Sequence, residues 1–333
     1  MITNRFVLID AFALIFRAYH ALPPLTNAKG VQLNAAYGFT SALLSSIKEL
    51  HPEYLAVGFD LPKPTKRHIE YVEYKAHRAP APPELSAQIP YVKEILKAFN
   101  IPTFAVEGYE GEDVIATIVA KCKNQKSNLK MTNQNSKLEY IIVTGDLDCL
   151  QLVNEDTKVY SMARGVNQAM MYDIAKVKER YGLSPSQFVD FKALKGDASD
   201  NIPGVPGIGE KGAAGLIKQF NSLEELYQAI NPKSETRNPK QIPNTEIIKK
   251  IQKNAQISER LFQILKENKE QAFLSQKLSK IDNSAPIDFR LEDAKIHDYD
   301  QKKIIKLFEE YGFRSLIKRL PTSSRIDNQQ TLL

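Results

Sequence analysis

Apolar residues in the first half of the chain recur at two different spacings. Five short runs rich in β-branched and aromatic residues are typical of buried strands, and they lie at 5–10, 54–60, 101–106, 140–146 and 157–162. Between these runs, apolar residues recur every three to four positions, which predicts helices at 34–50, 84–99 and 110–122. Strands that alternate with helices indicate a parallel, twisted α/β sheet with helices on its faces.

The strand pattern stops near residue 184, and the rest of the chain is predicted to be helical, with turns rich in Pro and Gly. We therefore expect an α/β domain at 1–183, a helical domain at 184–320 and a polar tail at 321–333. The segments 124–138 and 231–246 are polar and poor in apolar residues, so both are expected to be loops.

Composition narrows the class of protein only slightly. Lys and Arg number 45 against 39 Asp and Glu, a net charge of +6, which weakly favours an anionic partner. The two cysteines, Cys122 and Cys149, form neither a CxxC pair nor a zinc-type set with His, so buried or reduced thiols are expected. There is no signal-peptide pattern and no apolar run near the ~20 residues of a membrane helix, so we expect a cytoplasmic protein without membrane contact.

Acidic residues follow the predicted strands at the point where each strand ends. The strand-end acids are Asp10, Asp60, Glu110, Glu112, Asp113, Asp146 and Asp148, and two more, Asp197 and Asp200, lie in the helical half. A single Asp after a strand is most often a helix cap, and acids in a first helical turn are favoured by the helix dipole. The carboxyl ends of parallel strands nevertheless share one edge of a sheet, where ligands bind. The pattern therefore predicts that acids distant in sequence converge.

So many carboxylates cannot ionise together without strong repulsion unless cations neutralise them. Oxygen ligands without Cys or His favour Mg²⁺ or Mn²⁺ over zinc. Such a site suits phosphodiester hydrolysis, in which two ions roughly 4 Å apart activate the attacking water and stabilise the leaving oxygen. The motifs GxSxG and HExxH and the Walker A lysine loop are absent from the sequence. The acids therefore predict a metal-dependent hydrolase of phosphodiesters.

Basic and aromatic residues are interleaved in the Pro-rich segment 61–83. They are Lys63, Lys66, Arg67, His68, Tyr71, Tyr74, Lys75, His77 and Arg78. Cations bind phosphates and aromatic rings stack on bases, so this composition is typical of a segment that binds nucleic acid. A solvated helical face explains the composition equally well, but the position directly after Asp60 favours a function.

A glycine-rich turn opens a helix in the helical half, at 202–220. Gly204, Gly207 and Gly209 expose main-chain amides there, and Lys211 lies in the first turn of the helix that follows. A helix N-terminus under such a turn can bind an anion. The spacing GVPGIG is that of a helix–hairpin–helix contact with a DNA phosphate, and a plain turn between helices is the alternative.

Together these motifs resemble the flap-endonuclease family, which includes the 5′–3′ exonuclease domain of bacterial DNA polymerase I. The matching stretches are LIDAFALIFRAYHALPPLTN, FDLPKPTKR, EYKAHRAPAPPEL, YEGEDVIAT, TGDLDCLQLV, FKALKGDASDNIPGVPGIGEKGA and EEYGFRSLIKRL, which together span about residues 5–320. The resemblance implies a PIN-like, resolvase-like sheet domain followed by a helical domain with a helix–three-turn–helix motif. It also implies two Mg²⁺ or Mn²⁺ ions at the acids and K⁺ at the hairpin.

The resemblance further assigns roles to individual residues. Asp10, Asp60, Glu110 and Glu112 resemble ligands of one metal ion or of the region between the two, and Asp113, Asp146, Asp148, Asp197 and Asp200 resemble the other side of the cluster. Lys75 and Arg78 match a basic pair that contacts the scissile phosphate. The other positions that resemble DNA contacts are Phe16, Arg17, Lys66, Arg67, Tyr74, Gly204, Gly207, Gly209 and Lys211.

The chain departs from the family pattern in three places. Glu112 stands where the polymerase members usually have Asp, Ala11 replaces the usual Gly, and the segment 124–138 is longer than expected. We expect the longer carboxylate reach to preserve the site and the extra residues, which lie between elements, to be harmless.

The resulting hypothesis is a monomeric 5′ nuclease that cleaves DNA near 5′ ends, flaps and nicks and also removes RNA primers. A DNA polymerase is expected to act with it, in cis if the chain is a segment of a longer protein and otherwise in trans. Two alternatives remain, a PIN-like ribonuclease and a DNA-binding module without catalytic activity. The DNA-binding turn argues against the first, and the complete set of acids argues against the second.

Overall fold

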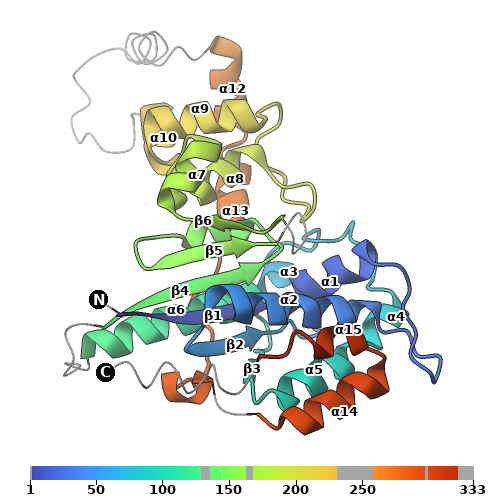
Figure 1. The fold of residues 1–333 in the computed structure, drawn as a ribbon. Helices are drawn as coiled ribbons and strands as arrows, with labels where there is room; N and C mark the ends of the chain where they lie inside the picture. Colours follow the sequence, from blue (N-terminus) through green and yellow to red (C-terminus); the bar gives the residue numbers. More distant parts are fainter. Residues whose placement is uncertain (1, 129–135, 163–167, 231–257, 297–298, 322–333) are drawn as a thin grey trace, which may run out of the picture. The chain divides into compact units, whose positions relative to one another are not determined.

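A six-stranded sheet forms the centre of the first unit of the protein (Figure 1). The computed structural model describes residues 2–128, 136–162, 168–230, 258–296 and 299–321. The strands are β1 Ile2–Asp10, β2 Tyr54–Gly58, β3 Thr103–Phe104, β4 Ser136–Thr144, β5 Thr157–Ser161 and β6 Met170–Tyr172. Their order is β3-β2-β1-β4-β5-β6, and every pair is parallel except β5 with β6. The predicted parallel α/β sheet is therefore confirmed, with one antiparallel edge strand added.

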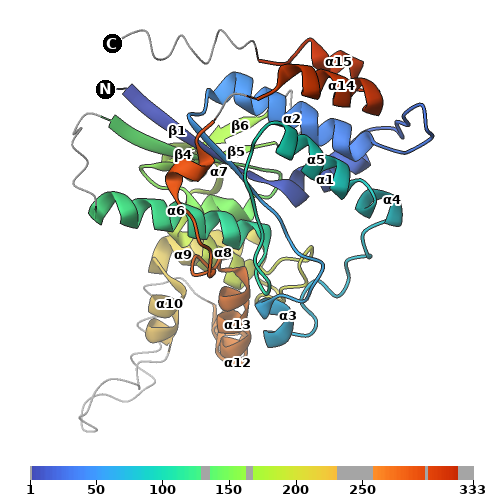
Figure 2. The same ribbon diagram turned by 90° about the horizontal axis from the view of Figure 1, so that it is seen from below.

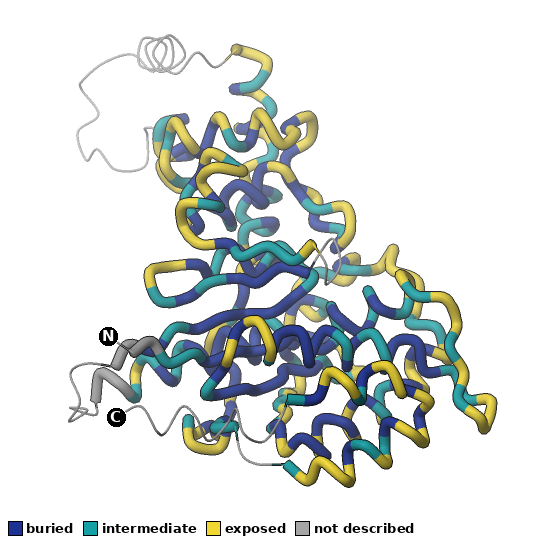
Figure 3. Tube along the Cα trace, viewed as in Figure 1, coloured by how far each residue is buried: buried dark blue, intermediate teal, exposed yellow. Residues whose placement is uncertain are grey.

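Helices cover both faces of this sheet. They are α1 Ala11–Ala21, α2 Asn34–Leu50, α4 Pro83–Ser86, α5 Ile89–Ala98, α6 Gly111–Asn128, α14 Gln301–Tyr311 and α15 Arg314–Ile317, with short 3₁₀ turns η1 Asp148–Leu152 and η5 Leu291–Ala294. Figure 2 shows α6 on one side of β1 and β4 and the helices α1, α2 and α5 on the other. Because both faces are covered, β1 and β2 are apolar and buried along most of their length, as Figure 3 shows.

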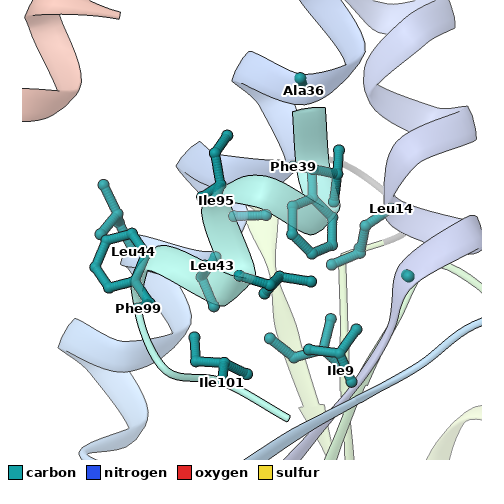
Figure 4. Packing of buried hydrophobic residues seen from close by; sticks show 14 of the residues in the cluster. Ile9, Leu14, Ala36, Phe39, Leu43, Leu44, Ile95, Phe99 and Ile101 are labelled. Carbon is teal, nitrogen blue, oxygen red and sulfur yellow. The ribbon is translucent and has the colours of Figure 1, made fainter. Parts of the chain in front are cut away.

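The main core lies between the sheet and the helices α1, α2 and α5. Ile9 from β1, Leu14 from α1, Phe39 from α2 and Ile95 from α5 pack together there (Figure 4). The helices α14 and α15 add Phe308 and other buried side chains to the same cluster. The last described helices therefore share the core of the α/β unit, although they come from the far end of the chain.

A second unit is helical and is built from two separate stretches of chain, 67–79 and 174–280. Its helices are α7 Ile174–Tyr181, α8 Phe188–Lys195, α9 Glu210–Phe220, α10 Leu223–Ile230, α12 Glu259–Glu267 and α13 Lys269–Ser279, with the 3₁₀ turn η3 Pro185–Gln187. The short helix α3, Lys66–Glu70, begins at Lys66, which belongs to the α/β unit. Its other residues belong to the helical unit. A sheet unit followed by a helical unit is the predicted order.

The division into units differs in two places from the domains that the sequence predicts. Residues 281–320 were expected in the helical domain, but the α/β unit holds them because α14 and α15 are part of its core. Residues 67–79 were expected in the α/β domain, but they belong to the helical unit. Packing between residues far apart in the chain determines to which unit each of these two segments belongs. The periodicity of apolar residues along the chain does not reveal such packing.

Local predictions agree with the structure except in a few segments. The segment 124–138 was expected to be a loop, but α6 continues to Asn128 and β4 begins at Ser136. The strand β6 was not predicted. The predicted loop 231–246 and the tail beyond residue 321 lie outside the described residues. In the part of the chain that the structure describes, none of the helices is both long enough and apolar enough to span a membrane.

Candidate active site

Three of the predicted acids lie at neighbouring strand ends in the middle of the sheet. Asp10 is the last residue of β1, which pairs with β2 on one side and with β4 on the other. Asp60 follows the end of β2 by two residues, and Asp146 follows the end of β4 by two residues. The parallel register of these three strands therefore places the three acids at one edge of the sheet, as the sequence predicts.

Asp10 is the most constrained of these acids. Its carboxylate accepts a hydrogen bond from the main-chain amide of Ala13 (3.2 Å), which caps α1, and another from the Thr144 hydroxyl (2.8 Å). Burial and the negative charges of Asp60 and Asp146 together raise the pKa of Asp10 to about 7, although the two hydrogen bonds act to lower it. Asp10 thus caps the helix α1, and its carboxylate is also repelled by the carboxylates of Asp60 and Asp146.

The start of α6 is held against the end of β2. The Asp60 carboxylate accepts a hydrogen bond from the amide of Gly111, at 3.1 Å. A Cβ atom on Gly58 would lie 2.9 Å from the carbonyl oxygen of Gly111, so only a glycine permits this approach. Glu110 and Glu112, on either side of Gly111, are thereby brought to the same edge of the sheet as Asp60.

The turn after β4 carries the next two acids. The Asp146 carboxylate accepts a hydrogen bond from the amide of Asp148 (2.8 Å), and the amide of Asp146 donates to the Thr144 hydroxyl (2.9 Å). The neighbouring thiol of Cys149 is fully buried. Burial raises the pKa of that thiol, and so do the charges of Glu112, Asp10, Asp146 and Asp148. Acids from three separate segments therefore act electrostatically on one buried atom.

These carboxylates fit the ligand set of a hard divalent cation. Their donor atoms are all carboxylate oxygens, and the negative charges of Asp60 and Asp146 add to burial in raising the pKa of Asp10. Within the described residues, no group of three or more His, Cys, Asp or Glu is yet close enough to enclose an ion. The donor chemistry fits the metal, and ligation would require these side chains to move together.

Two further predicted ligands belong to the helical unit, where each pairs with a cation. Asp197 accepts a hydrogen bond from the Lys192 ammonium (2.7 Å) and two more from the amide and hydroxyl of Ser199. Burial alone would raise the pKa of Asp197, but Lys192 and Ser199 outweigh it and lower the pKa to about 2. Lys192 is itself buried, with 5% of its surface exposed, and it was not predicted. A Lys between apolar residues in the middle of the helix FVDFKALK was the signal that could have found it.

Asp200 binds the two residues that were expected to contact phosphate. Arg78 donates to one of its carboxylate oxygens, and the Lys75 ammonium lies 3.9 Å from the other. The Tyr74 hydroxyl also donates to this carboxylate (3.2 Å), and the carbonyl of Asp200 accepts from the amide of Lys75. A predicted metal ligand and the predicted phosphate contacts therefore neutralise one another in this structure.

Two residues predicted to contact DNA, Arg67 and Tyr74, are buried in the helical unit. Arg67 is buried and donates to the carbonyls of Leu278 (3.0 Å) and Lys280 (2.8 Å), which the end of α13 leaves without helical partners. Tyr74 is 2% exposed and packs against Ile202 and Leu278. The sequence indicated a basic, aromatic segment correctly, but it could not show which side chains turn inward.

The other predicted DNA contacts remain near the surface. Lys66 lies 4.0 Å above the ring of Tyr109, donates to its hydroxyl and pairs with Asp282 at 3.4 Å. On α1, the ring of Phe16 contacts that of Phe12 with 5.7 Å between their centroids, and the adjacent Arg17 is half-buried. These positions remain predictions.

The glycines of the hairpin differ in what they do. Gly204 has a positive φ of 63°, and a Cβ atom there would lie 2.4 Å from the nitrogen of Gly196. Its amide donates to Ser275 and its carbonyl accepts from Gln271, so Gly204 holds the hairpin on α13. Gly207 and Gly209 have open space where a Cβ atom would be. These two glycines, Lys211 and the K⁺ expected at the hairpin remain predictions.

The fold and the acidic edge define an α/β nuclease-like unit joined to a helical unit with a hairpin. The family model of the 5′-3′ exonuclease N-terminal resolvase-like domain matches residues 5–182, and that of the 5′-3′ exonuclease C-terminal SAM fold matches residues 183–302. The chain belongs to the 5′-3′ exonuclease family. The expected resemblance to this family is therefore confirmed.

Individual relatives agree with this assignment. The chain is 37% identical over 321 residues to DNA polymerase I of Bacillus caldotenax, covering 96% of this chain and 33% of that protein. It thus spans about a third of the length of the curated relatives that it matches. The bacteriophage T5 D15 protein co-crystallized with metal ions has the same fold, with a TM-score of 0.60 at 21% identity over 84% of this chain and 90% of that one. The catalytic core of Rad2 in complex with DNA substrate aligns with a TM-score of 0.52 at 16% identity over 96% and 93%.

Proposed function

We propose that this protein hydrolyses phosphodiester bonds of DNA near 5′ ends, as a structure-sensitive 5′–3′ exonuclease and flap endonuclease. The observation that carries the proposal is the set of acids at the ends of β1, β2 and β4, where burial first, and then the negative charges of Asp60 and Asp146, raise the pKa of Asp10 to about 7. Such repulsion is relieved when the group binds divalent cations, which is the chemistry that phosphodiester hydrolysis uses.

The residues that would hold these cations are Asp10, Asp60, Glu110, Glu112, Asp146 and Asp148. Mg²⁺ is the cation we propose, and Mn²⁺ the substitute, because the donors are all carboxylate oxygens. When bound, the ions supply an acidified water and a counter-charge for the leaving oxygen. The T5 D15 protein, which shares the fold, was crystallised with metal ions.

Substrate binding falls to the helical unit and the segment 67–79. Lys75 and Arg78 would contact the scissile phosphate once they release Asp200. The role of Asp197 and Asp200 as metal ligands remains a prediction. Gly207, Gly209 and Lys211 would bind the DNA backbone at the N-terminus of α9. Since these contacts are to phosphates and not to base edges, specificity would come from the shape of the DNA.

The relatives suggest the biological setting. The chain matches about a third of the length of DNA polymerase I proteins, so we propose that it removes RNA primers and displaced flaps beside a polymerase. The Rad2 core, whose fold it shares, was crystallised with a DNA substrate. That likeness supports DNA as the substrate.

The test is cleavage of a 5′-labelled flap DNA with Mg²⁺ or with EDTA, reading the product length on a sequencing gel. A single-stranded RNA and a flap-free duplex serve as matched substrates. We expect short 5′ products from the flap only when Mg²⁺ is present. Preferred cleavage of the RNA would favour the ribonuclease alternative, and no cleavage of any substrate would favour a non-catalytic DNA-binding module.

A second arm tests the metal site. Asp148→Asn is expected to abolish cleavage in Mg²⁺ while DNA binding, measured in Ca²⁺ or EDTA, changes little. Near-normal cleavage by this variant would contradict the metal role of the acids.

A further inference from the structure

Asp113 occupies a special position in the first turn of α6. Its side chain accepts a hydrogen bond from the amide of Glu110, three residues earlier, at 3.0 Å. This is one half of a capping box, in which the third residue of a helix binds the amide of the residue that precedes the helix. The contact fixes the main chain of Glu110, which carries one of the acids of the proposed site.

The second oxygen of the Asp113 carboxylate binds a segment from the far end of the chain. The amide of Asp282 donates to it at 2.7 Å. Asp282 belongs to a stretch, 281–289, that follows α13 and runs along α6; we call this stretch the strap. Asp113 is 2% exposed, and both of its oxygens are therefore bound to main-chain amides inside the unit.

One face of α6 holds the whole strap. Asp113, Thr117, Lys121 and Gln125 are spaced four residues apart, which aligns them on one side of a helix. The amide of Ala285 donates to the Thr117 hydroxyl (3.0 Å), Lys121 donates to the carbonyl of Ile287, and Gln125 donates to the carbonyl of Phe289 (3.2 Å). Asp113 is thus the first of four contacts of the same kind.

The strap also contacts the other acid-bearing turn. The Gln151 side chain accepts a hydrogen bond from the amide of Ile281 (2.9 Å) and donates to the carbonyl of Asp148 (3.1 Å). Two consecutive strap residues, Ile281 and Asp282, therefore connect the turn of Asp148 to the turn of Glu110. These two turns are far apart in the sequence, and they follow the ends of different strands.

We infer that Asp113 and Gln151 are positioning residues, which hold Glu110 and Asp148 at a fixed spacing through the strap, and that Asp113 is not itself a metal ligand. This inference rests on the proposed metal site at the strand ends. Removing a residue that orients a ligand typically weakens metal binding by about 10–100-fold without abolishing it. Loss of a ligand removes the site's own charge and oxygen donor.

The experiment uses the full chain and two readouts that need no cleavage, thermal unfolding in EDTA and Mn²⁺ binding by calorimetry. Asp113→Asn cannot accept from both amides, so its unfolding temperature in EDTA should fall by several degrees and its Mn²⁺ affinity by about 10-fold. Asp148→Asn relieves repulsion among the acids, so its unfolding temperature should stay the same or rise while Mn²⁺ binding is lost. The unfolding temperature in EDTA should therefore fall when a positioning residue is replaced, but not when a ligand is replaced.

Thr117→Val is the matched control, because it breaks the next contact of the strap without touching Glu110. It should unfold at a lower temperature and bind Mn²⁺ like the unaltered protein. If Asp113→Asn unfolds no earlier in EDTA and loses Mn²⁺ binding as Asp148→Asn does, Asp113 is a ligand and the inference is wrong. If it unfolds earlier but binds Mn²⁺ normally, as Thr117→Val should, its role is only structural and the inference is equally wrong.

Gln151→Leu carries the same test from the Asp148 side should Asp113→Asn fail to fold. It should weaken Mn²⁺ binding by about 10-fold, and unchanged binding would overturn the inference. A failure of the unaltered protein to cleave flap DNA would contradict the proposed function alone. The absence of Mn²⁺ binding in the unaltered protein would contradict the metal site on which this inference rests.

Discussion

At the scale of single residues, the same type of side chain has different roles in this protein. Asp10 repels its neighbours, Asp113 binds two amides, and Asp197 pairs with Lys192. The surroundings decide which role applies, because a carboxylate is stabilised as an ion only where cations or amides face it. Two predictions follow from these surroundings.

The first prediction concerns Asp10 and pH. Its pKa is about 7 in the folded protein and 3.8 in its unperturbed state, so its stabilising contribution is present below pH 4 and is lost as the pH rises through 7. The substitution Asp10→Asn removes the ionisable carboxyl group, so the variant does not lose this stability as the pH rises. In EDTA at pH 8, Asp10→Asn should therefore be more stable than the unaltered protein by about 2–4 kcal/mol, at about 1.4 kcal/mol for each pKa unit, with little difference near pH 4.

Urea unfolding of both proteins at several pH values between 4 and 8 measures this difference. Each curve contains the titration of other groups, but their difference isolates Asp10. A constant difference across the range would show that Asp10 titrates normally in the folded protein.

The second prediction concerns Arg78. Its side chain is about half exposed, so its ion pair with Asp200 adds little stability, and Arg78→Ala should cost under about 1 kcal/mol. If Arg78 contacts the scissile phosphate, single-turnover cleavage should fall about 100-fold or more. Arg290→Ala, which removes the exposed ion pair with Asp293 in the α/β unit, is the control for stability and should cleave normally. Normal cleavage by Arg78→Ala would exclude the phosphate contact.

At the scale of elements, close approaches of the main chain position the acids and the hairpin. The strand β2 and the helix α6 meet at Gly58 and Gly111, and the two arms of the hairpin meet at Gly196 and Gly204. A sequence pattern shows a glycine-rich turn, but the reason for each glycine depends on what lies next to it in space. Gly204 and Gly209 illustrate this, since main-chain atoms occupy the place of a Cβ atom at Gly204 but not at Gly209.

Gly204→Ala is therefore expected to destabilise the protein strongly. The added Cβ would lie 2.4 Å from the nitrogen of Gly196, and the residue has φ of 63°. Strain of this kind and overpacking each cost about 1–3 kcal/mol. Gly209→Ala, at an extended position with open space, should cost under about 1 kcal/mol. Chemical unfolding of the two variants measures the contrast, and equal stabilities would contradict the assigned role of Gly204.

At the scale of the whole molecule, neither unit is a continuous stretch of chain. The chain enters the helical unit at residues 67–79, leaves it, and returns to it at 174–280. The α/β unit is completed only by residues after 280, through the strap and the helices α14 and α15. Folding of the first unit therefore depends on contacts between the two ends of the sequence.

Phe308→Ala tests this dependence. Phe308 on α14 is fully buried in the core that also holds Phe39 from α2 and Phe99 at the end of α5. Its truncation should lower the free energy of unfolding by about 3–5 kcal/mol. The exposed Lys302 on the same helix is the control, and Lys302→Ala should change stability by under about 0.5 kcal/mol. A change at Phe308 as small as the control would mean that α14 contributes little to this core.

The sequence alone determined the features that depend on neighbouring residues. Short runs of β-branched and aromatic residues and helical spacings predicted the order of strands and helices, and acids at strand ends predicted one acidic edge, because parallel strands end together. The three-residue strand β6 was too short to show a period. Tertiary structure decided which residues meet across long separations. Asp113 binds Asp282, Asp200 binds Arg78, and Arg67 turns inward to α13. These roles depend on hydrogen bonds and burial between segments more than a hundred residues apart, whereas a local pattern records only what each residue's chain neighbours require.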